Sequence, residues 1–212
     1  MTGNDLYWFS QAHGPLRREA IRLHRQRYEE IGFMPEDFQD AYEPDALYFG
    51  AWHRGSNQIV GVCRLVFGEL WSLSTVSCFE LFEKDRQALA LLAPGTYAEF
   101  GAFTKLPGHD VAGGLLSAAV QYVSDAGLTH VLCCVDERVK RHMQQRFGLP
   151  YRVIGATRPF HGSTKVPCVL SVTGLVDCME AFQRERPQGP AEHVASFCTA
   201  RKVVHSSQAH SA

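Results

Sequence analysis

The residues of this sequence best suited to chemistry are a few carboxylates and one arginine. Glu99 lies within the strand-like residues 97–104, and Arg64 lies near the end of the strand-like residues 58–67. Three acidic residues share a polar segment upstream of both, namely Asp40, Glu43 and Asp45. A carboxylate can take a proton from a reacting group, and a guanidinium can bridge an acidic loop and hold it over a site. A structural salt bridge and a solvated acidic loop explain the same residues about equally well.

A glycine pair and a cysteine pair suggest two further kinds of site. Gly113 and Gly114 stand near a predicted helix start, where N–H groups are available to an anion, although a glycine pair is also an ordinary way to enter a helix. Cys133 and Cys134 lie in an apolar strand near His130, and only Cys134 shares a face with that histidine. Because buried thiols in apolar strands are usually inert, we do not expect nucleophilic catalysis by cysteine.

The composition is that of an ordinary globular protein. The chain has 212 residues, 45% hydrophobic and 20% charged, which suits one domain with a sizeable core. Its formal net charge of −1 gives no global attraction to nucleic acid or anionic membrane. Seven cysteines without metal-site spacing predict reduced thiols and no metal. No signal peptide or transmembrane segment is recognisable, so we expect a cytoplasmic protein.

The pattern of apolar residues predicts helices alternating with strands. Helices are expected over residues 14–31, 111–126, 136–147 and 174–183, with one or two more within 78–92. Strands are expected over residues 46–52, 58–67, 97–104, 130–135, 151–154 and 166–172, the first two joined as an antiparallel hairpin. We expect one α/β domain over residues 1–185 and a polar, flexible tail over residues 186–212.

Four segments, taken in order and spacing, resemble the acyl-homoserine lactone (autoinducer) synthases and the N-acyl amino acid synthases. They are RYEEIGF at residues 27–33, DAYEPD at 40–45, GVCRL at 61–65 and AEFGAF at 98–103. The similarity extends from about residue 15 to residue 172. It implies a GNAT-like fold, in which a mixed, mostly antiparallel and twisted sheet is flanked by helices.

The resemblance also implies a reaction. In these families an acyl group passes directly from a thioester, usually on acyl carrier protein, to the amine of S-adenosylmethionine or of an amino acid. We therefore expect an acyl-phosphopantetheine or acyl-coenzyme A donor, no permanently bound cofactor, and a small-molecule amine as acceptor. The chain lacks the basic residue of the coenzyme A loop, which favours acyl carrier protein over coenzyme A. N-acyl transfer to an amino acid is the first hypothesis. Lactone synthesis from S-adenosylmethionine and a non-catalytic, GNAT-like acyl- or partner-binding module are the alternatives.

Roles for single residues follow from the same resemblance. Glu99 matches the glutamate of a Glu-x-x-Arg strand motif and is the candidate base. The arginine of that motif is Ala102 here, so an anchor for an acceptor carboxylate must come from elsewhere. On the acceptor side the resemblance points to Asp40, Glu43, Asp45 and Arg64, and the aromatic residues Phe33 and Trp52 are added as candidates. On the donor side it points to Phe100, Phe103, Thr104, Gly113 and Gly114. For the aromatic residues among these, packing in the core is the default explanation.

Overall fold

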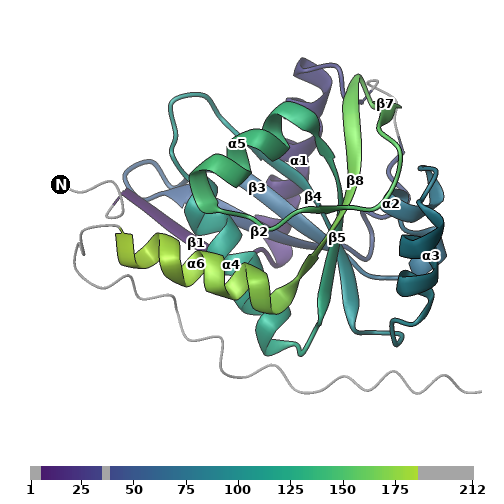
Figure 1. Ribbon diagram of the computed structural model, residues 1–212. Coiled ribbons are helices and arrows are strands. Elements are labelled where there is room, and N and C mark those ends of the chain that lie inside the picture. Colours follow the sequence, from purple (N-terminus) through teal and green to yellow (C-terminus); the bar gives the residue numbers. More distant parts are fainter. Residues whose placement is uncertain (1–5, 35–38, 186–212) are drawn as a thin grey trace, which may run out of the picture.

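The computed structural model describes residues 6–34 and 39–185, and the expected tail lies outside them. One sheet runs through this part of the chain (Figure 1). Its strands are β1 (Tyr7–Gln11), β2 (Leu47–His53), β3 (Gln58–Val66), β4 (Tyr97–Lys105), β5 (His130–Asp136), β6 (Arg152–Val153), β7 (Arg158–Phe160) and β8 (Ser163–Ser171). Their order is β1-β2-β3-β4-β5-β8-β6, with β7 also paired to β8. Only the β4–β5 pair is parallel among the pairs that the structure describes. The predicted mixed, mostly antiparallel sheet is confirmed.

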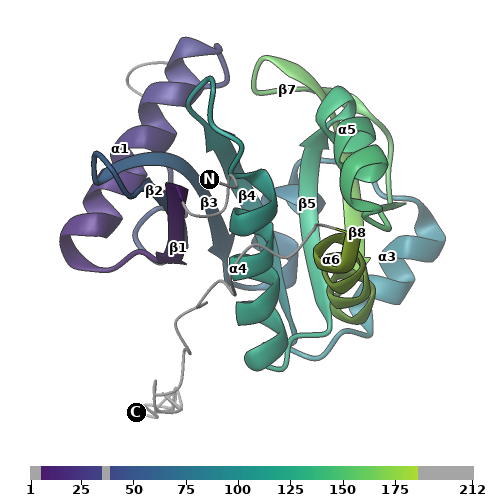
Figure 2. The same cartoon turned by 90° about the vertical axis from the view of Figure 1, so that its left-hand side faces the viewer.

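Helices cover both faces of the sheet, as Figure 2 shows. They are α1 (Gly14–Glu30), α2 (Ser74–Ser77), α3 (Glu83–Ala90), α4 (Ala112–Asp125), α5 (Glu137–Phe147) and α6 (Val172–Glu185), and the 3₁₀ turn η2 is Leu70–Ser72. Helices α4, α5 and α6 pack on one face, and α1 and α2 pack on the other. Each face therefore has its own hydrophobic core, and the sheet separates the two.

Local signals account for the elements that the sequence predicts. Helix α5 begins after Asp136, whose carboxylate accepts hydrogen bonds from the backbone of Arg138 and Val139, and it ends at Gly148 in the left-handed conformation, with φ 67°. The β2–β3 hairpin closes through a turn in which Asn57 adopts φ 53°. Strands β1 and β7 are short and were not predicted, and the helical turns η2 and α2 begin upstream of the expected 78–92 helices.

The parallel pairing of β4 and β5 is short. It covers only three pairs and ends at Glu99 opposite Leu132, although both strands continue. Figure 2 shows the two strands leaning apart beyond this point. Strand β5 pairs along its whole length with β8 instead. The β4–β5 pairing in the sheet therefore ends at Glu99.

A β-bulge lies just after the end of this pairing. In the β3–β4 pairing Arg64 stands opposite Gly101 and Val62 stands opposite Thr104, so two β4 residues oppose Cys63 alone. One of the two is Ala102, which has the left-handed φ of 52°. Such a conformation is uncommon for a residue with a side chain, and bulges of this kind often lie beside active sites. The bulge turns β4 away from the path that β5 follows.

Among the described helices, none has both the length and the apolar character needed to cross a membrane.

Candidate active site

Glu99 lies at the end of the β4–β5 pairing, on the face that α1 and α2 cover. Its neighbour Tyr97 belongs to the core of that face, and Phe100 points to the opposite face. The carboxylate of Glu99 accepts a hydrogen bond of 2.9 Å from the backbone N–H of Thr75, at the start of α2. Only 8% of Glu99 is exposed.

Burial gives Glu99 an unusual pKa. Removal from water raises the pKa of its carboxyl to about 7, and the hydrogen bonds from Thr75 and the charge of Arg64 oppose that rise. A carboxylate with a pKa near neutrality can both take up and release a proton at physiological pH. Perturbed groups of this kind concentrate at functional sites. The position and the pKa of Glu99 both suit a general base.

Arg64 forms a buried network beside Glu99. Its guanidinium makes an ion pair with Asp40 and donates a hydrogen bond of 3.2 Å to the Tyr48 hydroxyl. The Tyr48 hydroxyl lies 3.3 Å from Nδ1 of His24, on α1. Burial, with the charge of Arg64 in addition, lowers the pKa of His24 to about 3, so this histidine is neutral. Arg64 thus ties the acidic segment to β3 and β2, and its charge lies near Glu99.

The three carboxylates of the acidic segment, Asp40, Glu43 and Asp45, lie in different environments. Asp40 is drawn to Arg64, and its carboxylate is almost fully buried. Glu43 instead forms a two-pronged surface ion pair with Arg25 of α1, with both distances 2.8 Å. Asp45 is exposed. Of the three predicted carboxylates, the structure brings Asp40 to the site and leaves Glu43 and Asp45 outside the buried network.

The two aromatic residues assigned to the acceptor side occupy different positions. Phe33 follows the end of α1, packs edge-on against Tyr28 and has the ammonium of Lys165 3.8 Å from its ring centroid. Trp52 is fully buried and stacks on Trp8 with ring centroids 4.3 Å apart. Trp52 is therefore a core residue with no exposed surface for a substrate. Phe33 remains available at the edge of the site.

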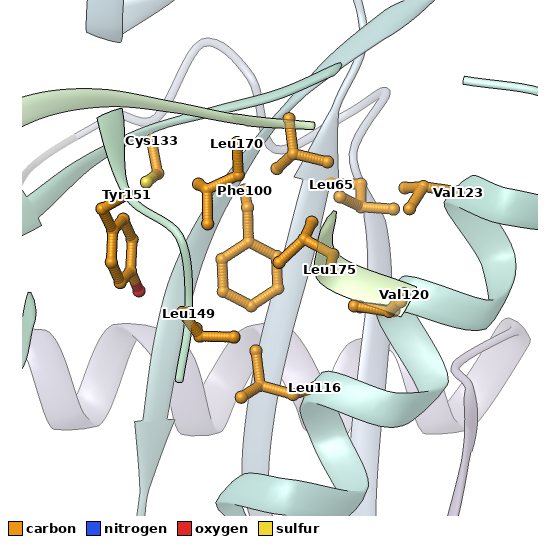
Figure 3. A pocket seen from close by; sticks show the side chains of 12 residues that line it. Leu65, Phe100, Leu116, Val120, Val123, Cys133, Leu149, Tyr151, Leu170 and Leu175 are labelled. Carbon is orange, nitrogen blue, oxygen red and sulfur yellow. The ribbon is translucent and has the colours of Figure 1, made fainter. Parts of the chain in front are cut away.

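An apolar pocket lies on the face of the sheet that α4 covers, opposite the face that carries the Glu99 side chain. Phe100 stands in the middle of its lining in Figure 3, between Leu149 and Leu175. The free space is about 30 Å³, room for two or three waters at about 10–15 Å³ each. The polar side-chain atoms of its lining belong to Tyr151 and Cys133. The apolar lining has the chemistry that an alkyl chain requires, but the free space is far smaller than that of a ligand pocket.

The other donor-side candidates lie in β4 and at the start of α4. Phe103 lies in the β4 bulge with its ring 5.7 Å from that of Phe100, and Thr104 pairs with β3. Gly113 and Gly114 lie in the first turn of α4, where an added Cβ would meet the rings of Phe182 and Phe9 at 2.7 and 2.2 Å. Close ring packing thus explains both glycines without a bound phosphate.

The cysteines of β5 are not activated. Burial raises the pKa of Cys134 to about 12 and raises that of Cys133 well above its ordinary value. Both thiols are free and stay protonated at neutral pH. The six cysteines that the structure describes carry no disulfide, and its described residues hold no cluster of three or more metal-ligating side chains.

Sequence reasoning missed several residues of this site. Thr75, Tyr48 and His24 are positioned by contacts across 24 or fewer residues of chain, and no local motif marks them. Lys165 of β8 is 8% exposed and faces the same side of the sheet as Glu99. Lys165 directly precedes the apolar run Val166–Leu170. A lysine is rarely buried in such a strand, and this is the signal that could have identified it.

Solved structures of acyl-transferring enzymes share this fold. The structure of FeeM, an N-acyl amino acid synthase from uncultured soil microbes, superposes with a TM-score of 0.64, at 18% identity over 85% of this chain and 98% of that one. TofI, solved with an inhibitor and MTA, gives 0.59, at 18% identity over 82% of this chain and 96% of that one. MesI, a CoA-dependent acyl-homoserine lactone synthase, gives 0.57, at 14% identity over 86% of this chain and 97% of that one.

A GNAT neighbour lies in the same group. The putative N-acetyltransferase from Lactobacillus plantarum has a TM-score of 0.54, at 16% identity over 79% of this chain and 99% of that one. No curated protein sequence is a significant match. The family model for the N-acyl amino acid synthase FeeM matches residues 19–173, from within α1 to the start of α6. Since that match takes in most of the chain and every element of the site, the chain belongs to the FeeM family of N-acyl amino acid synthases.

Proposed function

We propose that the chain moves a fatty acyl group from acyl carrier protein to the amine of an amino acid, with Glu99 as the base. As a member of this family the chain is an acyltransferase. The observation that carries the assignment of Glu99 is its place at the end of the β4–β5 pairing, with a pKa of about 7. A base there lies between an acceptor side lined by Arg64 and Asp40 and an apolar pocket for the acyl chain.

The proposed reaction is a direct attack. Glu99 takes a proton from the acceptor ammonium, and the neutral nitrogen attacks the thioester carbon. The carbonyl oxygen becomes an oxyanion, for which the backbone N–H groups of β4 beyond Glu99 are suitable donors, because β5 does not pair with that stretch. Collapse of the tetrahedral intermediate breaks the carbon–sulfur bond and releases a thiolate. The thiolate takes up the second proton that the nitrogen loses as the amide forms.

Two features favour a carrier protein over coenzyme A. Residues 106–114, which lead into α4, contain Asp110 and neither lysine nor arginine, a poor environment for a nucleotide diphosphate. Helix α5, by contrast, carries Arg138, Lys140, Arg141 and Arg146 against one acidic residue of its own, Glu137, although Arg138 and Arg146 are paired with Asp136 and Asp110. This helix packs on the face that holds the acyl pocket. An acidic carrier protein would be attracted to it.

Reversing one charge on α5 tests this docking. We expect Arg141→Glu to lower kcat/KM by about tenfold with an acyl carrier protein donor, because steering by opposite charges raises association rates by tenfold or more. The same variant should leave kcat/KM with a short acyl-pantetheine donor unchanged. Arg54→Glu, in the exposed β2–β3 turn, is the matched control. Steady-state rates at low and high salt measure the effect, and equal losses with both donors would contradict docking on α5.

The Phe100 ring in the lining of the acyl pocket predicts which chains are used. Phe100 fills its centre, so removing the ring should favour long chains (Figure 3). We expect Phe100→Ala to raise the ratio of kcat/KM for dodecanoyl over hexanoyl donors by about tenfold or more, since each methylene in a fitted pocket is worth about that much. Phe147→Ala, a buried ring outside this pocket, is the control for general destabilisation. An unchanged ratio in Phe100→Ala would exclude Phe100 from the acyl site.

Lipids from cells expressing the protein test the function as a whole. We expect mass spectra with N-acyl amino acids that are absent from cells expressing Glu99→Gln. Acyl-homoserine lactones in their place would favour the S-adenosylmethionine alternative, and the absence of any new acyl amide would favour the non-catalytic module.

A further inference from the structure

Thr75 touches the proposed base with two of its groups. It lies in α2 and is fully buried. Its backbone N–H donates a hydrogen bond of 2.9 Å to Oε2 of Glu99. Its hydroxyl also acts on this carboxylate, because both groups of Thr75 favour the ionised form and lower the pKa of Glu99. One residue, on an element separate from β4, therefore presents two donors to the base.

The hydroxyl of Thr75 has no structural use of its own. In a helix a threonine hydroxyl commonly bonds to the carbonyl oxygen one turn back, but within the described residues the buried Oγ1 of Thr75 makes no complete hydrogen bond. A hydroxyl that is buried and unsatisfied costs free energy. Valine would fill the same space without that cost, so packing alone does not explain a threonine at this position. The Glu99 carboxylate is the group beside it that can use the hydroxyl.

The turn that carries Thr75 is fixed in place. Leu73 and Val76, on either side of Thr75, belong to the core under α1 and α2. At the other end of α2, Arg158 of β7 donates a hydrogen bond of 2.8 Å to the carbonyl oxygen of Cys78. Because its backbone is held in this way, Thr75 presents both donors at a constant position. Groups that are already in place lose no free energy to reorganisation during a reaction.

We propose that Thr75 is the positioning residue of Glu99, with its N–H fixing Oε2 and its hydroxyl bonding to the carboxylate in both protonation states. This inference rests on the proposed function of N-acyl transfer. A hydroxyl can donate to an ionised carboxylate and accept from a protonated one, whereas an N–H can only donate. With Oε2 held by Thr75, Oε1 is the oxygen that takes the proton from the acceptor ammonium.

Other titratable groups share this face of the sheet with Glu99, and the test must separate their effects from that of Thr75. They are His24 of α1, Tyr48 of β2, Arg64 of β3, Cys134 of β5, Lys165 of β8 and Asp40. The charge of Arg64 lowers the pKa of Glu99 and that of Asp40 raises it. A substitution of Thr75 leaves all six in place, so a shift in the titration of Glu99 reports the hydroxyl.

The first test replaces the hydroxyl by a methyl group. We expect Thr75→Val to lower kcat/KM at pH 7 by about tenfold and to move the rise of kcat/KM with pH upward by about one unit, the effect of losing a hydrogen bond to a charged group. Thr75→Ser keeps the hydroxyl and should recover most of both losses. Thr164→Val, an exposed threonine of β8, is the matched control. An unmoved pH profile, or Thr75→Ser that behaves as Thr75→Val does, would overturn the proposal.

A second test reads the same contact without turnover. Carbon-13 NMR of the side-chain carboxyls of glutamate identifies Glu99 by the signal that is missing in Glu99→Gln. Its titration midpoint should lie near 7 in wild type and about one unit higher in Thr75→Val. Equal midpoints would overturn the inference even if acyl transfer is demonstrated. If the midpoint moves as expected but no acyl donor is turned over, the proposed function fails while the contact between Thr75 and Glu99 stands.

Discussion

Replacing Glu99 by glutamine should lower kcat for N-acyl transfer by about 10²- to 10⁴-fold, the usual worth of a general base. The amide keeps the size of the side chain and can still accept the hydrogen bond from Thr75, but it takes up no proton. Single-turnover rates with a saturating acyl donor measure the loss. Glu80→Gln, an exposed residue, is the matched control and should behave as wild type.

The pH profile separates catalysis by Glu99 from a structural role. In wild type kcat/KM should rise with pH through about 7, as Glu99 loses its proton, and the acceptor amine adds its own limb at higher pH. Glu99→Gln should lack the limb near 7. A glutamine variant that keeps both the rate and this limb would contradict the assignment.

Stability gives an independent reading of the same pKa. The unfolded carboxyl ionises near 4.5, whereas the folded one keeps its proton to about 7. The folded state therefore binds more protons than the unfolded state in this window and loses stability as pH rises through it. The glutamine of Glu99→Gln does not ionise, so the variant does not lose stability in this way as the pH rises. Its unfolding free energy relative to wild type should rise by on the order of 3 kcal/mol between about pH 5 and pH 8.

Replacing Arg64 by methionine should lower the unfolding free energy by about 3–5 kcal/mol, because it leaves the buried carboxylate of Asp40 without its partner. Urea denaturation measures the loss. The double variant Arg64→Met with Asp40→Asn should be more stable than Arg64→Met alone, since no buried charge is then unpaired. Arg25→Met removes the exposed pair with Glu43 and should cost less than about 1 kcal/mol. Equal losses in Arg64→Met and Arg25→Met would contradict the buried pair.

The single variants Arg64→Met and Asp40→Asn should shift the pH dependence of kcat/KM near pH 7 in opposite directions. The charge of Arg64 lowers the pKa of Glu99 and that of Asp40 raises it. Arg64→Met should therefore shift the limb above 7, and Asp40→Asn should shift it below.

The parts of the fold that local chemistry determines were predictable from the sequence. Helix α5 has its cap at Asp136 and its stop at Gly148, and the β2–β3 hairpin has a short polar turn, so each was found near its observed bounds. Strand β1 was not predicted. Its five half-buried residues carry no alternating pattern, and they pair with a strand about 40 residues away. Its Phe9 packs against Gly114, a residue for which the sequence left open both an anion site and an ordinary helix entry.

The site was harder to predict, because tertiary contacts define it. Glu99 and Arg64 were proposed from their motifs, but the β4 bulge depends on pairing with β3 and leaves no local signature around Ala102. Trp52 and Phe33 are both aromatic residues for which the sequence suggests the same role. In the structure Trp52 is fully buried, whereas the ring of Phe33 lies against the ammonium of Lys165. Lys165 faces the same side of the sheet as Glu99 because β8 pairs with β5.

Reconstitution with purified components tests the central claim most directly. The protein would receive an acyl carrier protein donor with a pool of amino acids and S-adenosylmethionine together, and the products would be identified by their exact mass. The account predicts an N-acyl amino acid formed in equal amount with free carrier thiol, and a strongly reduced yield in Glu99→Gln. A lactone released only when S-adenosylmethionine is present would contradict it.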